Sequence, residues 1–101
     1  MSTAHVYLTE EARNTVPALG AMESTSDPTV WVKLFTPDSS WTWYVIETDG
    51  TDLCFGYVVG VEPELGYFSL FELAAVRGKL GLRIERDLYF RPKPLSEVLI
   101  K

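Results

Sequence analysis

The sequence predicts an α+β fold, a small single domain in which an antiparallel sheet of about four strands carries one short helix. Three observations predict it. Apolar residues alternate from Thr29 onward, an Asp49-Gly50 pair is typical of hairpin turns, and Ser69 with Glu72 fits a helix capping box. The 101 residues suit one domain, 1–101.

The N-terminal part predicts one short helix. The Thr9 hydroxyl is placed to accept an amide hydrogen at the start of "EEARN", and Pro17 ends the helix. We expect residues 1–7 to form a flexible tail and the small, polar segment 20–28 to form a loop.

Four segments predict strands: 29–35, 41–48, 52–61 and 82–90. The first two form a hairpin through "TPDSS". The Asp49-Gly50 pair joins the second to the third in a type I′ turn, which needs positive φ at both central residues. Both faces of these strands are apolar, so we expect each to be covered.

The capping box starts the helix "LFELAAVR", which packs on the sheet, and Gly78 is expected to end it. Arg86 interrupts the apolar face of the segment 82–90. Either a β-bulge turns it outward or it forms an ion pair with a carboxylate of the acidic part of the chain, and we expect the ion pair. Two prolines keep the segment 91–101 extended.

Charge divides the chain into two parts. Residues 1–72 hold eleven acids and two bases, a charge of −9, whereas residues 73–101 hold three acids and seven bases, a charge of +4. The basic part either folds back on the acidic part or forms a separate surface.

No apolar run approaches the roughly 18 residues that span a bilayer, no signal peptide is recognisable, and Cys54 is the only cysteine. A cytoplasmic protein without a membrane role is expected.

Three long motifs lie within about residues 8–98: "DPTVWVKLFTPDSSWTWYVIETDG", "FGYVVGVEPELGYFSLFEL" and "VRGKLGLRIERDLYFRPKPLSEV". Together they closely resemble a bacterial family, the domain of unknown function 2958. The resemblance implies a compact single domain, often encoded on plasmids, phages or integrated mobile elements. It supplies no catalytic residue.

Few residues offer chemistry. His5 lies in the expected tail and Cys54 within an apolar strand, so we expect an inert thiol rather than a catalytic pair, and structural zinc needs several such ligands. "ETDGTD" lacks calcium-loop spacing, and the glycines form no phosphate-binding motif. We therefore expect no cofactor, no metal and no enzymatic activity. One alternative is a hydrolase using Glu62 and Glu64, but Pro63 favours a solvated rim that pairs with Arg86 or Arg77.

The binding surfaces are predicted from charge and aromatic content. The aromatic residues Trp41, Trp43 and Tyr67 are core, a protein interface or a stacking platform for bases. Residues 29–68 contain six acids and one lysine, which disfavours nucleic acid. The alternative nucleic-acid surface is the basic patch Arg77, Lys79, Arg83, Arg91 and Lys93.

The sequence thus favours a non-catalytic protein-binding module, an accessory or anti-defence factor that binds and inhibits a host nucleic-acid-processing protein. Its partner is a host protein with a basic surface, and the oligomeric state is left open. The expected acidic surface comprises Glu47, Asp49, Asp52, Glu62 and Glu64. The alternatives are an accessory nucleic-acid binder that uses the basic patch and, third, the hydrolase.

Overall fold

The sheet has five antiparallel strands in the order β5-β4-β3-β2-β6, and the short helices α2 and α3 accompany it. The structure is a computed structural model that describes residues 7–99. The sheet strands are β2 (Val32–Phe35), β3 (Thr42–Thr48), β4 (Leu53–Val59), β5 (Pro63–Ser69) and β6 (Glu85–Arg86). The helices are α2 (Glu10–Thr15) and α3 (Leu70–Ala75). The predicted α+β class is confirmed.

A second, two-stranded sheet pairs β1 (Thr29–Val30) with β7 (Lys93–Pro94). The strand expected over 29–35 is therefore divided between two sheets. The segment after β7 forms the 3₁₀ helix η1 (Leu95–Glu97), whose Leu95 is buried. The extended C-terminal segment thus contributes to the fold, and the amide of Leu95 donates to the carbonyl of Pro28.

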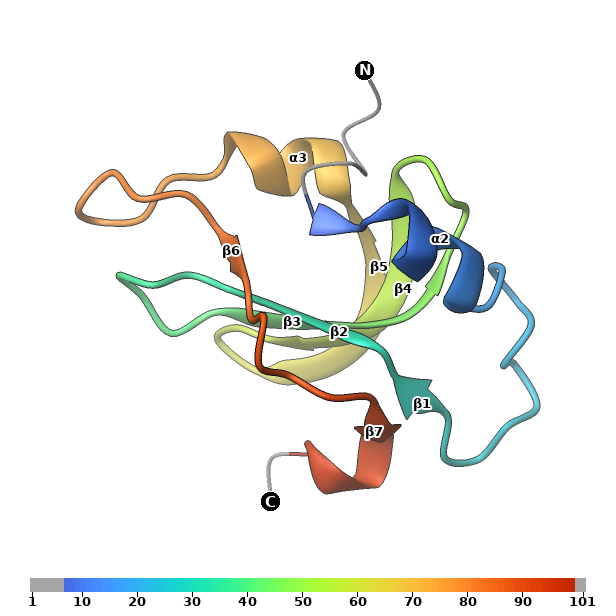
Figure 1. The fold of residues 1–101 in the computed structure, drawn as a ribbon. Coiled ribbons are helices and arrows are strands. Elements are labelled where there is room, and N and C mark those ends of the chain that lie inside the picture. Colours follow the sequence, from blue (N-terminus) through green and yellow to red (C-terminus); the bar gives the residue numbers. More distant parts are fainter. Residues whose placement is uncertain (1–6, 100–101) are drawn as a thin grey trace.

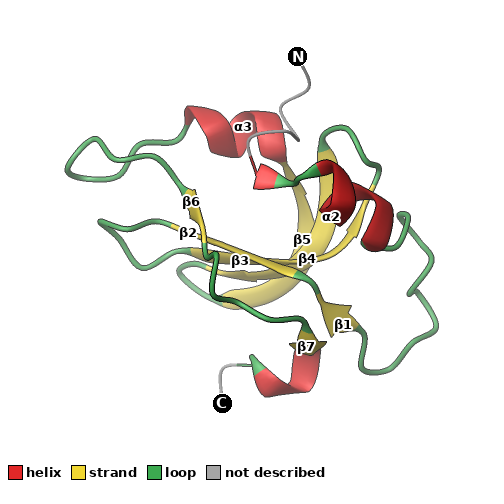
Figure 2. Cartoon of the chain, viewed as in Figure 1, coloured by secondary structure: helices red, strands yellow, loops and turns green. Residues whose placement is uncertain are grey.

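Both faces of the main sheet are covered, as the apolar strands predicted. Figures 1 and 2 show α2 and α3 on one side of the sheet and β7 with η1 on the other. We call these sides the helix face and the opposite face. The helix-face core includes Leu34, Trp43, Val45, Phe68 and Leu70. The core of the opposite face comprises Val30, Ile46, Tyr57 and Leu95.

The two predicted hairpins are present, but the turn between β3 and β4 differs from the expected type I′. Gly50 has φ +82°, and no non-glycine residue among residues 7–99 has positive φ. A type I′ turn needs two such residues, so that prediction was wrong. Strand β3 ends at Thr48 and β4 begins at Leu53, which leaves a four-residue loop over residues 49–52.

A β-bulge interrupts the alternation of β3 between Val45 and Glu47. One extra residue in a strand shifts the following side chains to new directions. Ile46 packs in the core of the opposite face, as alternation with Val45 requires. The bulge changes the direction of Glu47, which is buried although the sequence predicts it on an exposed surface.

None of the four predicted strands covers β5. Seven residues of β5 pair antiparallel with β4, from Leu53 opposite Ser69 to Val59 opposite Pro63. The chain then enters α3 directly, and the Ser69 hydroxyl accepts the amide hydrogen of Glu72, as predicted. The helix ends at Ala75 rather than near Gly78, so the predicted glycine stop was wrong.

The last predicted strand, 82–90, is mostly not a strand. Only Glu85 and Arg86 pair with β2. The Arg86 guanidinium donates to the carbonyl oxygen of Tyr7 at 3.2 Å and forms no ion pair within residues 7–99, so the predicted ion pair was wrong. Tyr7, placed by prediction in the tail, is a buried core residue.

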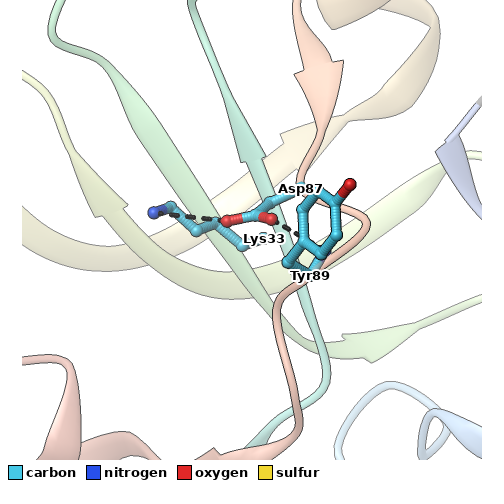
Figure 3. Close-up of polar contacts among 3 residues, drawn as sticks. All are labelled: Lys33, Asp87 and Tyr89. Atoms are coloured by element: carbon cyan, nitrogen blue, oxygen red, sulfur yellow. Dashed lines mark hydrogen bonds and ion pairs between the residues drawn. The ribbon is translucent and has the colours of Figure 1, made fainter.

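Asp87 forms the ion pair instead. Its carboxylate lies 3.7 Å from the Lys33 ammonium and accepts the amide hydrogen of Tyr89 at 2.9 Å (Figure 3). The amide of Asp87 also donates to the carbonyl of Lys33. These contacts attach the segment after β6 to β2, while the Tyr89 side chain points into solvent.

Candidate functional site

The five acidic residues of the predicted surface have different roles. Glu47 is only 4% exposed. Its two carboxylate oxygens accept the amide hydrogens of Gly20 and Met22 at 2.9 and 2.7 Å. Residues 19–28, which precede β1, are called the 19–28 loop. Because a carboxylate held by two backbone amides fixes their positions, Glu47 attaches this loop to β3. It lies inside the protein and not on an exposed surface.

Asp49 organises the turn after β3. One oxygen of its carboxylate accepts the amide hydrogens of Thr51, Asp52 and Leu53 at 2.8 to 3.1 Å. Burial alone raises the pKa of Asp49, but these backbone donors stabilise the charged form more strongly and lower its pKa below the ordinary value. Asp49 is exposed, and its carboxylate stabilises the turn.

Asp52 caps α3 from outside the helix. Its carboxylate accepts the Ser69 hydroxyl at 2.8 and 3.0 Å and the amide hydrogen of Phe71 at 2.6 Å. The N-terminal amides of a helix lack partners within the helix, so this carboxylate satisfies a donor that Ser69 does not reach. The contact fixes the start of α3 to the turn between β3 and β4.

Glu62 and Glu64 are the members of the set with exposed side chains and no hydrogen bond or ion pair within residues 7–99. Glu62 lies in the turn between β4 and β5, and Glu64 lies in β5. Arg77 donates to the carbonyls of Ala74 and Val76 instead, so the expected pairing with Arg77 or Arg86 is not formed. A catalytic role for the two glutamates stays a prediction.

The three candidate aromatic residues do not form one surface. Trp43 is 7% exposed and belongs to the helix-face core, and Trp41 stacks on it with ring centroids 5.9 Å apart. Tyr67 is 64% exposed and packs edge-on against Phe55, at 4.9 Å between centroids. Tyr67 therefore belongs to the opposite face and Trp43 to the helix face.

Tyr67 lines a groove on the opposite face. The groove encloses about 400 Å³ on the opposite face, between β4, β5, the 19–28 loop and η1. Its apolar lining comes from Met22, Ile46, Phe55, Leu65, Tyr67 and Leu95, and Glu23, Thr25 and Ser26 add polar groups. Leu65, which the sequence did not single out, is 52% exposed beside Tyr67. A concave apolar site with a few polar groups is typical of a binding site.

The basic residues divide into two groups. Arg77 and Arg83 pair across an isolated bridge, so they stand with Lys79 at the loop between α3 and β6. Arg91 and Lys93 belong to the segment that leads into β7, where the Lys93 ammonium lies 5.1 Å from the centre of the Phe90 ring. Figure 1 shows the loop and β7 at different ends of the molecule, so the predicted basic patch is two smaller groups.

The remaining candidates offer little reactivity. Cys54 is fully buried, and burial raises the pKa of its thiol to about 11. This agrees with the predicted inert thiol, because the thiolate is the reactive form. His5 lies outside the described residues. Within residues 7–99 no group of three or more His, Cys, Asp or Glu side chains is arranged to hold a metal ion, and no helix there is long and apolar enough to cross a membrane.

The family assignment rests on nearly the whole chain. A family model described as "Protein of unknown function (DUF2958)" matches residues 4–100. The chain belongs to this family. The family resemblance of the motifs is therefore confirmed. Comparisons with curated proteins and with solved structures find no match. The description of the DUF2958 family names no activity, so the evidence for a function of this protein comes from the groove itself.

Sequence reasoning found Tyr67 but missed the groove around it. Pro63, Leu65 and Tyr67 alternate with period two, which was the signal for β5. Pro63 and Gly66, which are uncommon inside strands, concealed it. The 19–28 loop and η1 line the groove from distant parts of the chain, and no local pattern indicates that they meet.

Proposed function

We propose that this protein is a non-catalytic protein-binding module that uses the groove of the opposite face. The observation that carries the proposal is the exposure of Leu65 and Tyr67 at the margin of an apolar groove. Aromatic side chains beside an apolar pocket are the usual anchors of protein interfaces. The partner inserts an apolar side chain between Phe55, Leu65 and Tyr67.

The charge around the groove defines the class of partner. Residues 42–76, which contain β3, β4, β5 and α3, hold six acidic residues and no lysine or arginine. Their field attracts a basic surface and repels nucleic acid. Proteins that bind nucleic acid carry such basic surfaces, so we propose as partner a host nucleic-acid-processing protein, inhibited by occupation of that surface.

Affinity capture with matched variants tests the proposal. Wild type, Tyr67→Ala and Tyr89→Ala serve as baits, because both tyrosines are exposed but only Tyr67 lines the groove. We expect wild type and Tyr89→Ala to retain the same basic protein and Tyr67→Ala to bind it at least about tenfold more weakly. DNA or RNA added as a competitor should displace the captured basic protein from the wild-type bait. Equal retention by all three baits would refute the groove as the binding site.

The loop with Arg77, Lys79 and Arg83 supports a second candidate, accessory binding of nucleic acid. These three side chains are exposed together, and Leu80 beside them is exposed as well. If the loop binds phosphates, a Lys79→Ala and Arg83→Ala double variant should bind DNA more weakly and with a smaller dependence on salt. Measurement of binding at several salt concentrations separates this candidate from the groove, since Tyr67→Ala should leave it unchanged.

A further inference from the structure

The outer edge of β5 exposes unpaired backbone groups at alternate residues. The amide of Leu70 donates to the carbonyl of Asp52, so Leu53 and Ser69 are a non-hydrogen-bonded pair of the antiparallel ladder. Because hydrogen-bonded and non-hydrogen-bonded pairs alternate, Glu64, Gly66 and Phe68 exchange their backbone hydrogen bonds with β4. The amides and carbonyls of Leu65 and Tyr67 therefore point away from the sheet. Within residues 7–99 nothing pairs with them.

The two edges of the sheet differ in their protection. Strand β6 has only two residues, both charged, and the segment after it is held to β2 by the Lys33–Asp87 ion pair. Short and charged edges resist the addition of another strand. Strand β5 has seven residues, and two large apolar side chains accompany its unpaired backbone groups. Of these two edges in the described part of the chain, β5 is the one long enough to accept a strand.

The side chains of Leu65 and Tyr67 determine which residues an added strand should carry on the opposite face. Leu65 and Tyr67 lie on the opposite face and line the groove. A strand added to β5 would lie about 4.8 Å away, and every second side chain of it would stand on the same face. Those side chains would extend the apolar surface of Leu65 and Tyr67, so they are apolar.

Glu64 determines which residues an added strand should carry on the helix face. Glu64 lies opposite Val58, which packs against the helix-face core, so the exposed Glu64 carboxylate lies on the helix-face side of the edge. Lys or Arg at the alternate positions of an added strand would stand beside this carboxylate. A second copy of the chain would instead bring another acidic edge, because residues 42–76 contain no lysine or arginine.

We propose that β5 binds an extended segment of a partner protein by antiparallel addition of a strand, and that apolar residues alternate with Lys or Arg in this segment. The inference rests on the proposed protein-binding function and specifies its mode. Backbone hydrogen bonds to Leu65 and Tyr67 supply affinity, and the groove with Glu64 selects the sequence.

Selection from a display library of random linear peptides on the wild-type protein tests the proposal. We expect enriched peptides to alternate apolar with basic residues. The affinity of these peptides is then measured for two variants of the protein. Leu65→Pro removes an outward amide hydrogen, whereas Leu65→Ala removes the side chain but keeps the amide hydrogen. Leu65→Pro should bind about tenfold more weakly than Leu65→Ala. The control is Gly66→Ala, because an added Cβ at Gly66 has nothing within 4 Å and its amide already pairs with β4.

Methylation of peptide amides gives the same comparison on the unaltered protein, should Leu65→Pro fail to fold. Methylation of the alternate peptide amides that face β5 should abolish binding. Methylation of the peptide amides that face away from β5 should leave binding intact. Three outcomes would overturn strand addition: equal effects of methylation at both sets of amides, equal peptide affinity of Leu65→Pro and Leu65→Ala, or no enriched peptide. The groove is tested separately, because loss of partner capture by Tyr67→Ala would still support it. A concentration-dependent dimer in sedimentation that Leu65→Pro abolishes would assign the edge to a second copy and overturn the proposal.

Discussion

The turn between β3 and β4 and the edge strand β5 use similar residues in opposite ways. At the end of β3 and in the turn that follows, the carboxylates of Glu47, Asp49 and Asp52 accept seven hydrogens, six from backbone amides and one from the Ser69 hydroxyl. In β5 and the turn before it, Glu62, Glu64 and the backbone of Leu65 have no such partner within the described residues. Acidic charge in one region stabilises the fold, whereas in the other it is available to a partner.

The difference shows that a cluster of acids in a sequence is not one surface. Carboxylates accept backbone amides readily, and an aspartate near a turn or a helix start is satisfied locally. Every ionised acid contributes to the field, but only the acids left without such donors have carboxylates that can contact a partner directly. Substitutions in the two regions should therefore affect different properties.

The largest effect on stability is expected at Glu47. Replacement of Glu47 by Ala leaves the amides of Gly20 and Met22 without their acceptor in a part-buried site. We expect a loss of about 2 to 4 kcal/mol in the free energy of unfolding, measured by denaturant titration. Glu47→Gln should lose less, because its amide keeps one acceptor oxygen. An unchanged midpoint for Glu47→Ala would contradict the structural role of Glu47.

The next largest effect is expected at Asp52. Asp52→Ala removes the acceptor of Ser69 and Phe71 at the start of α3. A lost N-terminal cap typically costs about 1 to 2 kcal/mol. Denaturant titration measures the loss, and Asp27→Ala offers a comparison because Asp27 also accepts a backbone amide, that of Ser96, far from α3. Equal hydrogen exchange of the α3 amides in wild type and Asp52→Ala would count against the cap.

Asp49 should contribute a smaller stability that depends on pH. Its folded pKa lies below the ordinary value of 3.8, so its contribution is complete above about pH 4 and is lost as pH falls through the lower folded pKa. Asp49→Asn should be less stable than wild type by about 0.5 to 1 kcal/mol at pH 7. This difference should shrink below about pH 4 in denaturant titrations at several pH values. A difference that grows in acid would reverse the sign and refute the assignment.

Glu62 and Glu64 should have the smallest effect on folding and a clear effect on binding. The double variant Glu62→Lys and Glu64→Lys should unfold within about 0.5 kcal/mol of wild type, since neither carboxylate has a partner in the described chain. Association with a basic partner should slow, because complementary charge mainly raises the association rate. Stopped-flow or surface-binding kinetics at low and high salt measure the change. A destabilised variant would show that these acids also serve the fold.

Local patterns predicted the parts of the fold that local chemistry controls. Thr9 and Ser69 begin their helices as predicted, because each hydroxyl accepts an amide three residues ahead. Glu47 could not be placed, since a β-bulge removes the period-two rule at that residue. Leu88 and Tyr89 fit a strand pattern but are exposed, because the chain turns after Asp87, whose carboxylate and carbonyl accept the amide hydrogens of Tyr89 and Phe90. The groove depends on contacts between distant segments that no local pattern contains.

Amide hydrogen exchange along β5 tests the central claim that this edge is left for a partner. In the free protein, the amides of Gly66 and Phe68 should be protected by their hydrogen bonds to β4, while those of Leu65 and Tyr67 should exchange as fast as amides in exposed turns. Binding of an extended segment should then protect Leu65 and Tyr67 as well. Leu65 and Tyr67 amides that exchange as slowly as those of Gly66 and Phe68 in the free monomer would contradict the claim.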